Sequence, residues 1–327
     1  MVPEHILEVA DLHTHFFTKE GVLKALNGVT LRLRRGGVLG LLGESGAGKS
    51  LTALSILRIV PYPGKIVQGK VLFEGRDLLD LEETQMRAIR GREISLVFQD
   101  PVAGLNPMLD VGSQVGEVLQ EHLAISRRDA REEAKVVLTR VGLPNPTQLV
   151  DMYPFQLSGG MAQRVMIGMA LALNPKLIIA DEPTAALDVT IQAQILEFLK
   201  RLRRERDMSI LLISHDLGVM ASMAEEVAVI YAGTVIELAD TRTLYRYPAH
   251  PYSWGLMQSL PQADLPRRRL HTIAGIPPSL MELPDQCPFL PRCHKAVSLC
   301  RTESRPPLQE VSPGQWVACY NPMVRVD

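Results

Sequence analysis

Residues 38–57 read Val-Leu-Gly-Leu-Leu-Gly-Glu-Ser-Gly-Ala-Gly-Lys-Ser-Leu-Thr-Ala-Leu-Ser-Ile-Leu, and this stretch decides the fold. Residues 38–42 have the length and apolar character of a buried strand, and residues 51–57 read as a helix. The string between them, Gly43–Ser50, fits the pattern Gly-x-x-x-x-Gly-Lys-Ser/Thr of a phosphate-binding loop, or P-loop. Because that motif requires a strand before it and a helix after it, the sequence predicts an α/β P-loop NTPase core.

The loop has the chemistry needed to bind a triphosphate with Mg²⁺. Its glycines have no Cβ, so the backbone can wrap around phosphates and point its N–H groups inward. Lys49 is expected to reach the β- and γ-phosphates, and the Ser50 hydroxyl is a candidate Mg²⁺ ligand. The positive end of the following helix adds to the attraction. The candidate binding residues are therefore Gly43, Glu44, Ser45, Gly46, Ala47, Gly48, Lys49 and Ser50.

Polar side chains follow three further apolar strand candidates. Residues 177–181 end in Asp181, which is followed by Glu182; residues 210–214 lead to His215; and residues 94–98 lead to Gln99. Ligands of open parallel sheets bind beyond the carboxyl ends of the strands. We therefore expect Asp181 and Gln99 to serve Mg²⁺, and Glu182 to orient or deprotonate an attacking water. His215 is expected to donate to a γ-phosphate oxygen or to hold that water, and the Gln99 amide can also reach it, so Glu182, His215 and Gln99 are the candidate catalytic residues.

A second glycine-bearing segment, Leu157-Ser-Gly-Gly-Met-Ala-Gln163, precedes a helix candidate at residues 162–171. Ser158 is expected to be the N-cap of that helix. Gly159 and Gly160 are expected to leave N–H groups open beside it. The segment is therefore predicted to be a second anion site, and one chain cannot easily use both sites on one nucleotide.

The whole chain has 327 residues, of which 46% are hydrophobic, and a net charge of −1. Such a composition indicates about two domains and offers no overall basic field for nucleic acid. The basic run Lys200–Asp207 is interpreted as the solvated end of a helix. We find no apolar stretch of membrane-spanning length and no secretory signal, so we expect a cytoplasmic chain that meets membranes through partners.

Taken together, these motifs resemble the ATP-binding-cassette (ABC) family. The resemblance rests on the P-loop, Gln99, the Leu157–Gln163 signature, Asp181-Glu182, the segment Ala186-Leu187-Asp188 (the D-loop) and His215. It implies ATP as the nucleotide, Phe16 as the aromatic that stacks on adenine, and Asp188 as a further site residue. It also implies a head-to-tail dimer with a paralogue or a second copy, in which one subunit's signature closes the other subunit's P-loop. Met161 departs from the Gln of many members.

Finer features resemble one branch, the ATPase subunits of oligopeptide, dipeptide and nickel importers, of the dipeptide-permease D type. These features are Phe98–Pro101, His250-Pro251-Tyr252 and Cys287-Pro-Phe-Leu-Pro-Arg-Cys293. The resemblance implies two transmembrane permease subunits, an extracytoplasmic substrate-binding protein and a peripheral position at the cytoplasmic face of the membrane. Nickel import, and a soluble ABC ATPase outside transport, are the alternatives.

All four cysteines lie near the end of the chain, at Cys287, Cys293, Cys300 and Cys319. Clustered cysteines in a cytosolic chain favour metal over disulfides, although no pair has Cys-x-x-Cys spacing. Four thiolates suit either tetrahedral Zn²⁺ or a [4Fe–4S] cluster, and structural thiols without metal are the third interpretation. The resemblance implies iron–sulfur, which we favour over zinc; His294 is a weaker candidate ligand.

The domain plan follows from these features. We expect a nucleotide-binding domain over residues 1–240 with a helical insertion at about 100–160, and the resemblance implies that this insertion is the subdomain that docks a permease. A C-terminal extension over residues 241–327 is rich in proline, as in Pro248, Pro277 and Pro291. Because proline interrupts strands, we expect loops there rather than a continuation of the sheet.

Overall fold

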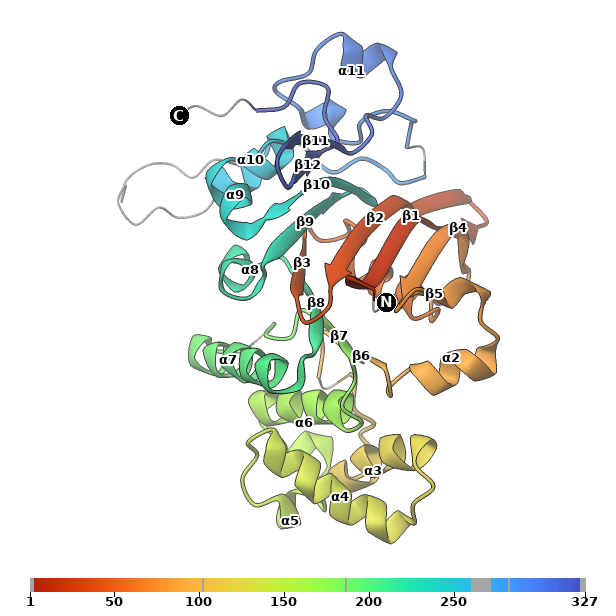
Figure 1. Ribbon diagram of the computed structural model, residues 1–327, viewed down its shortest axis with the longest axis vertical. Coiled ribbons are helices and arrows are strands. Elements are labelled where there is room, and N and C mark those ends of the chain that lie inside the picture. The colour runs from red at the N-terminus through yellow and green to blue at the C-terminus, as the bar shows by residue number, and fades with distance from the viewer. Residues whose placement is uncertain (1–2, 102, 186, 260–271, 282, 324–327) are drawn as a thin grey trace. The chain divides into compact units, whose positions relative to one another are not determined.

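The computed structural model describes residues 3–101, 103–185, 187–259, 272–281 and 283–323, and these form two compact units (Figure 1). Unit 1 comprises Met1–Leu33, Val38–Leu79 and Ser214–Asp327. Unit 2 comprises Arg34–Gly37 and Asp80–Ile213. Ala186 of the expected D-loop lies outside the described residues. The expected domain boundary at residue 240 stays a prediction.

Unit 1 contains the N-terminal strands, the P-loop and the C-terminal region. Its strands are β1 (His5–Thr18), β2 (Gly21–Arg34), β3 (Val38–Leu42), β4 (Gly64–Phe73), β5 (Arg76–Asp77), β9 (Glu226–Tyr231), β10 (Thr234–Asp240), β11 (Gln309–Ser312) and β12 (Gln315–Val317). Its helices are α1 (Lys49–Ile56), α8 (Leu217–Met223), α9 (Thr241–Arg246), α10 (Pro251–Gln258) and α11 (Leu299–Thr302). Two short 3-10 helices are η1 (Leu78–Asp80), at the boundary with unit 2, and η3 (Leu290–Arg292).

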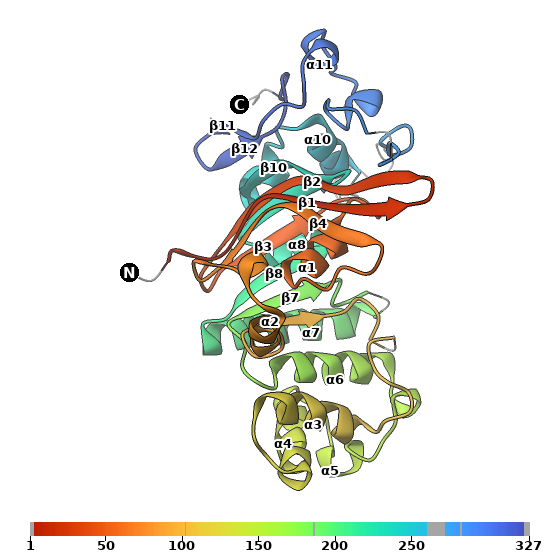
Figure 2. The same ribbon diagram turned by 90° about the vertical axis from the view of Figure 1, so that its right-hand side faces the viewer.

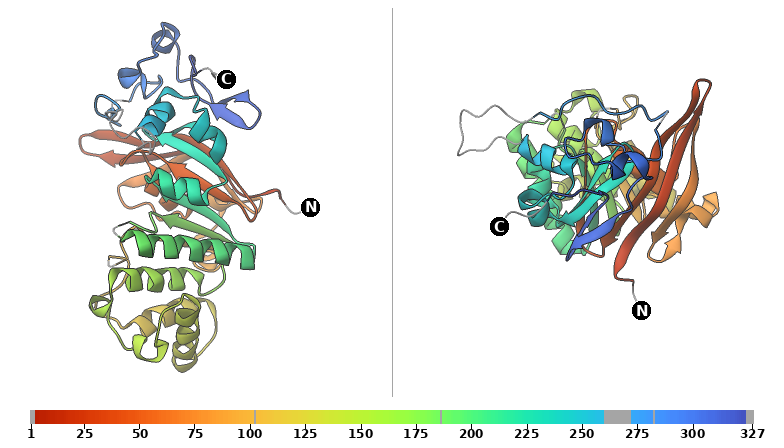
Figure 3. Two further views of the ribbon diagram at one scale, coloured as in Figure 1. Left: turned by 90° about the vertical axis from the view of Figure 1, so that its left-hand side faces the viewer. Right: turned by 90° about the horizontal axis from the view of Figure 1, so that it is seen from above.

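Two sheets form this unit. One is antiparallel in the order β2-β1-β4-β5, and Figure 3 shows β1 and β2 as long neighbouring strands. In the other, β3 pairs in parallel with β9, and β9 pairs antiparallel with β10. All five residues of β3 are buried, as expected for the central strand that leads into a P-loop.

The C-terminal region continues the second sheet, so the expectation that no strands follow residue 241 is wrong. Strand β12 pairs antiparallel with β10 and with β11, and Glu237 lies opposite Val317 in the register. Gly314, with φ 73°, makes the turn between β11 and β12. Neither β11 nor β12 contains a proline, and Pro313 lies in the turn beside Gly314, so the prolines of this region do not prevent the strands from pairing.

A buried carboxylate in β10 holds the C-terminal region in place. Glu237 is 0% exposed, and it accepts hydrogen bonds from the N–H groups of Ala249 (2.7 Å) and His250 (2.8 Å). The amide of Gln315 donates a third bond at 2.9 Å. Burial raises the pKa of Glu237, and these donors oppose the shift.

Unit 2 contains the helical insertion and three parallel strands. Its elements are α2 (Glu83–Ile89), β6 (Ile94–Val97), α3 (Val111–His122), α4 (Arg127–Arg140), α5 (Pro146–Leu149), η2 (Pro154–Gln156), α6 (Gly159–Leu171), β7 (Leu177–Asp181), α7 (Val189–Arg206) and β8 (Ser209–Ser214). Strand β7 pairs in parallel with β6 and β8, and every residue of β7 and β8 is buried. Figure 2 shows α3, α4 and α5 grouped beside α6.

The strands predicted from apolar runs are therefore confirmed, and so is a helical insertion between Gln99 and the signature. The basic run Lys200–Asp207 is confirmed as a helix end, because α7 ends at Arg206 and Asp207 adopts a left-handed C-cap. Over the part of the chain that the structure describes, no helix is long and apolar enough to cross a membrane.

Candidate active site

The loop Gly43–Ser50 joins β3 to α1 in unit 1, as predicted. Gly46 and Gly48 have φ angles of 78° and 105°, which favour glycine strongly. A Cβ at Gly43 would lie 2.3 Å from the carbonyl oxygen of Ile230 in β9. The loop therefore runs so close to the neighbouring strand that only glycine fits at its first position.

Lys49 and the start of α1 give this loop its positive character. The Lys49 side chain is buried, and its Nζ donates to the carbonyl oxygens of Gly43 (2.8 Å) and Glu44 (3.0 Å). Gly48 is the N-cap of α1 and makes no side-chain capping bond, so the helix start keeps its attraction for anions. Ser50 is exposed in the first turn, where a hydroxyl can reach a metal ion. Ammonium, backbone N–H groups and a hydroxyl together suit a Mg²⁺-bound phosphate chain.

Two residues of the C-terminal region hold this loop, and sequence reasoning missed them. The Tyr252 hydroxyl accepts a hydrogen bond from the Glu44 N–H at 3.0 Å. Arg292 forms an ion pair with the Glu44 carboxylate at 3.0 Å. The available signal was their position inside the His250–Tyr252 and Cys287–Cys293 segments, which the sequence analysis connects with a family branch and a metal site but not with the P-loop.

Phe16, the expected adenine-stacking residue, lies in β1 of the same unit. It is half-buried and sits close to Gly64, where an added Cβ would lie 2.9 Å from its ring. Its neighbour Phe17 is exposed, with Lys65 Nζ 5.8 Å from its ring centroid. The assignment of adenine to Phe16 stays a prediction.

In unit 2, strand β7 ends at the two acids that the sequence singled out. Asp181 is buried at the strand's carboxyl end. Glu182 follows with φ 47°, and its N–H donates to the Ile213 carbonyl at 2.9 Å. A left-handed conformation at a residue other than glycine is uncommon and costs free energy, and such residues occur at turns and helix ends as well as at functional sites. The backbone therefore turns at Glu182, so this carboxylate leaves the direction of the strand that ends at Asp181.

Gln99 and His215 also follow their strands as predicted. Gln99 comes after β6 in unit 2, and His215 comes after β8 at the start of the last segment of unit 1. Both residues are exposed. Their catalytic roles stay predictions.

The signature segment opens α6, and Ser158 is its N-cap, as predicted. The Ser158 hydroxyl oxygen accepts a hydrogen bond from the Met161 N–H at 3.3 Å. The helix begins at Gly159 rather than at residue 162, because the cap sets the first turn. Asp188 is likewise an N-cap, of α7, and accepts from the Ile191 N–H at 2.9 Å.

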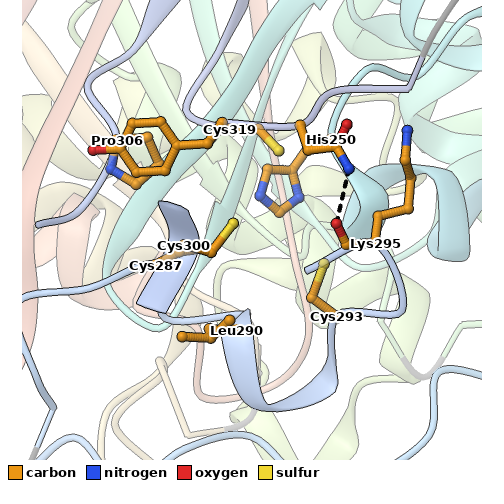
Figure 4. A pocket seen from close by; sticks show the side chains of 10 residues that line it. His250, Cys287, Leu290, Cys293, Lys295, Cys300, Pro306 and Cys319 are labelled. Atoms are coloured by element: carbon orange, nitrogen blue, oxygen red, sulfur yellow. Dashed lines mark hydrogen bonds between the residues drawn. The ribbon is translucent and has the colours of Figure 1, made fainter. Parts of the chain in front are cut away.

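The four cysteines lie around one small cavity in unit 1 (Figure 4). All four are free thiols. Burial raises the pKa of Cys287 to about 11 and that of Cys319 to about 12, and repulsion from the other thiolates adds to both shifts. The pKa of Cys293 is also raised, chiefly by burial. The chain thus gathers cysteines that are far apart in sequence at one place.

His250 also lines the cavity, and Figure 4 shows its ring among the cysteines. Its Nδ1 accepts a hydrogen bond from the Tyr252 N–H at 3.0 Å, so the neutral ring carries its proton on Nε2. That Nε2 is buried without a hydrogen-bond partner. Burial lowers the His250 pKa to about 3, so the ring is neutral. His294, the weaker candidate ligand, instead packs against Trp254, with ring centroids 5.5 Å apart.

These thiols give a mixed answer on metal binding. Among the described residues, which include all four cysteines, no group of three or more His, Cys, Asp or Glu side chains is arranged to hold a metal ion. The four cysteines nevertheless line one cavity, and four cysteine thiolates are the donor set by which proteins bind iron–sulfur clusters.

The fold and the loop at Gly43–Ser50 define a P-loop nucleotide-binding protein. Comparison with known proteins gives the family. Residues 26–185 match the ABC transporter family, and residues 236–300 match the C-terminal region of oligopeptide and dipeptide transporters. The chain belongs to the ABC transporter ATPases, and it is an ATPase of that family.

Curated relatives resemble the chain over nearly its full length. It is 45% identical to the dipeptide transport ATP-binding protein DppD of Bacillus subtilis, covering 96% of this chain and 92% of the relative. It is 45% identical to the oligopeptide transport ATP-binding protein OppD of Salmonella typhimurium, covering 97% and 94%.

A solved structure resembles the nucleotide-binding part. The ATP-binding cassette MJ0796, described as a dimer in a post-hydrolysis state bound to ADP and Pi, matches with a TM-score of 0.65 and 29% identity. The match covers 72% of this chain and 99% of MJ0796. The predicted P-loop ABC fold is therefore confirmed.

Proposed function

We propose that this chain hydrolyses ATP to power the import of di- and oligopeptides through partner permeases. The observation that carries the proposal is the 45% identity to peptide transport ATP-binding proteins along almost the whole chain, including the C-terminal region. Relatives that shared only the nucleotide-binding part would support an ATPase but no particular cargo. The buried attachment of the C-terminal region through Glu237 agrees with a conserved function of both parts.

In the proposed site, Phe16 stacks on adenine and the loop Gly43–Ser50 binds the phosphates. Lys49 exchanges its bonds to the loop carbonyls for bonds to phosphate oxygens, which are stronger because both partners are charged. Ser50 of unit 1, and Asp181 and Gln99 of unit 2, each carry a side-chain oxygen of the kind that Mg²⁺ prefers, and they would serve as its ligands. When bound there, Mg²⁺ would neutralise part of the charge that develops on the phosphates during transfer.

For hydrolysis, a water attacks the γ-phosphorus in line with the bond to the β-γ bridging oxygen. Glu182 accepts a proton from that water, and His215 donates a hydrogen bond that orients the water or a γ-phosphate oxygen. The bridging bond breaks, and ADP and inorganic phosphate leave. The residues contribute positioning and charge stabilisation, as in phosphoryl transfer generally.

The signature acts in the proposal on a neighbouring subunit. Ser158, Gly159 and Gly160 of one subunit bind the γ-phosphate of ATP held by the P-loop of the other, and Asp188 belongs to the same contact. MJ0796 is described as a dimer bound to ADP and Pi, which supports a dimeric assembly. The second subunit is a paralogue or another copy of this chain.

The remaining partners follow from the same relatives. The proposal places the chain peripherally at the cytoplasmic face of the membrane, with two permease subunits and an extracytoplasmic substrate-binding protein. The helical region of unit 2 offers exposed apolar side chains for a permease, including Met108 (81% exposed) and Phe155 (75% exposed). Nucleic acid has no place in this proposal.

We propose further that Cys287, Cys293, Cys300 and Cys319 hold a [4Fe–4S] cluster, with Zn²⁺ as the alternative. The cavity shared by the four thiols supports this assignment. When bound, the cluster would supply a structural link between distant parts of the C-terminal region. His250 would donate its Nε2 proton as a hydrogen bond to a sulfur rather than act as a ligand, because that nitrogen carries the proton.

The metal assignment is tested on anaerobically purified full-length chain. Iron and acid-labile sulfide in equal amounts, with visible absorbance that bleaches on reduction, are expected. Stoichiometric zinc in a colourless protein would contradict the cluster. Two results together would contradict any metal: four thiols that titrate freely in metal-free protein, and an unfolding temperature of that protein equal to that of the protein as purified.

The transport assignment is tested by purifying the tagged chain from detergent-solubilised membranes. We expect two multi-spanning subunits to co-purify, and a labelled dipeptide or oligopeptide to be taken up only when the chain is present. Uptake of radioactive nickel without peptide uptake would move the proposal to the nickel alternative. ATP hydrolysis with no membrane partner would favour a soluble ABC ATPase.

A further inference from the structure

Two segments of the C-terminal region pack together beside the nucleotide loop. Phe289, from the Cys287–Cys293 segment, is buried with its ring centroid 5.4 Å from that of Tyr252 and 5.3 Å from that of Tyr231 at the end of β9. His250 lies 5.8 Å from the same ring. Tyr231, His250, Tyr252 and Phe289 form an aromatic cluster that packs beside Arg292.

Arg292 satisfies all five of its N–H donors. Nη1 donates to Glu44 Oε2 (3.0 Å) and to the Tyr231 hydroxyl (3.1 Å), and Nη2 donates to Glu44 Oε1 (3.3 Å) and the Ile273 carbonyl (3.3 Å). Nε donates to the Ala274 carbonyl at 3.0 Å. The side chain is only 6% exposed. A buried guanidinium that grips a carboxylate with two parallel bonds fixes both its position and its orientation.

The gripped carboxylate belongs to the second residue of the P-loop. Glu44 makes three contacts: its carboxylate accepts from Arg292, its N–H donates to the Tyr252 hydroxyl, and its carbonyl accepts from the P-loop lysine, Lys49. The Ala47 N–H also donates to the Glu44 carbonyl, at 3.1 Å. Glu44 therefore connects the C-terminal region directly to the lysine that is expected to bind phosphate.

We propose that Arg292 and Tyr252 are positioning residues for ATP, which hold the first turn of the P-loop in its nucleotide-binding shape. A loop held in that shape before the nucleotide arrives loses less conformational entropy on binding. Arg292 acts on affinity through Glu44 and makes no part of the chemical step. The inference rests on the P-loop assignment of the proposed function.

The position of Arg292 extends the inference to the cysteines. Arg292 immediately precedes Cys293, and Phe289 lies two residues after Cys287. Any change that loosens the Cys287–Cys293 segment also loosens the hold on Glu44. The structural order of the Cys287–Cys293 segment therefore contributes to the affinity of the chain for ATP.

The test compares Arg292→Gln, Arg292→Lys and Tyr252→Phe in the full-length chain. We expect Arg292→Gln to raise the dissociation constant for MgATP about tenfold, because the pair of charge-assisted hydrogen bonds to Glu44 is lost. Tyr252→Phe is expected to raise it about threefold, because one neutral bond is lost. Arg292→Lys, which keeps the charge without the fork, falls between wild type and Arg292→Gln.

The chain offers matched controls. Arg301 is exposed and adjacent to Cys300, as Arg292 is adjacent to Cys293, so Arg301→Gln makes the same change without touching Glu44. Tyr62, which is 95% exposed, provides Tyr62→Phe. Both controls are expected to bind MgATP as wild type does. In the assembled ATPase, Arg292→Gln is expected to raise KM for ATP while kcat stays within about twofold, because the variant changes only how well the P-loop is held in its nucleotide-binding conformation.

A double-mutant cycle with Glu44→Gln isolates the contact. If Arg292 acts through Glu44, the double variant binds MgATP no more weakly than the worse single variant. Additive effects, or wild-type affinity in Arg292→Gln and Tyr252→Phe, would overturn the inference. Should Arg292→Gln fail to fold, Tyr252→Phe, which removes a single oxygen, decides alone. Loss of MgATP binding in Lys49→Ala, with wild-type binding in both positioning variants, would sink this inference and leave the proposed function standing.

Discussion

Two helices of this chain begin at glycine-bearing loops, and they begin differently. Helix α1 of unit 1 starts after Gly48, which has a left-handed φ of 105° and makes no side-chain capping bond. Helix α6 of unit 2 starts after Ser158, whose extended backbone lets its hydroxyl accept the Met161 N–H at 3.3 Å. One helix start is uncapped by its own side chains, and the other is capped.

The two proposed anion sites are therefore shaped in different ways. The loop before α1 is shaped from outside, by Arg292, Tyr252 and the tight approach to Ile230. The loop before α6 is shaped by its own serine, whose oxygen accepts the Met161 N–H while its O–H can still donate to a phosphate oxygen. We therefore expect the first site to bind nucleotide in the isolated chain and the second to act only in an assembled dimer.

The largest effect is expected at the first loop. Lys49→Ala removes the ammonium, so ATP hydrolysis should fall by about two orders of magnitude or more. Fluorescent-nucleotide titration and phosphate release measure binding and turnover. Lys176→Ala, which removes an exposed lysine paired with Glu93, is the control. Unchanged hydrolysis in Lys49→Ala would remove the P-loop from the site.

A separate change divides binding from chemistry. Glu182→Gln keeps the shape but cannot accept a proton, so turnover should fall by about 10²–10⁴-fold while ATP stays bound. Single-turnover kinetics with retained radiolabelled ATP would measure this. Normal turnover would show that another group activates the water.

A smaller effect is expected at the second loop. Ser158→Ala removes a cap worth about 1 kcal/mol to the helix and should lower dimer turnover about tenfold, with MgATP binding to the isolated chain unchanged. Ser126 caps α4 with the same backbone angles, φ −68° and ψ 158°, and accepts the Asp129 N–H at 3.2 Å. Ser126→Ala should therefore cost similar stability and leave turnover intact. Equal turnover losses in both variants would reduce Ser158 to a structural cap.

The smallest effect concerns stability of unit 2 at low pH. Asp110 caps α3 and pairs with Arg131; burial opposes ionisation, but bonds from Ser113 and Arg131 lower its pKa below 3.8. A lowered pKa stabilises the fold above the unfolded pKa, and this gain is lost as pH falls from about 4 through the folded value. Asp110→Asn should flatten that loss in thermal melts between pH 5 and pH 3. An unchanged acid limb would show that other carboxylates dominate it.

The sequence allowed the parts of the fold with local signals to be predicted. The strand candidates at 38–42 and 177–181 coincide with β3 and β7, and Ser158 caps α6 as its position before two glycines indicates. Helix starts were misplaced by a few residues because caps, and not apolar periodicity, determine them.

What could not be predicted depends on contacts between distant residues. Arg292 and Glu44 are 248 positions apart, and nothing in either segment indicates the other. The β11–β12 hairpin was missed because its strands are short and because β12 joins the sheet through β10, which lies far from it in the sequence. Phe16 and the four cysteines had indirect signals, and their roles remain proposals.

The three donors around Glu237 make the C-terminal region inseparable from the motor domain in engineering terms. Ala249, His250 and Gln315 all lie beyond Asp240, so a chain cut there would keep a carboxylate built for burial and lose every group that compensates it. The same cut would strip β10 of its neighbour β12 and leave a bare sheet edge. Shortened versions or chimaeras of such ATPases should be joined elsewhere, with residues 237–317 transplanted as one block.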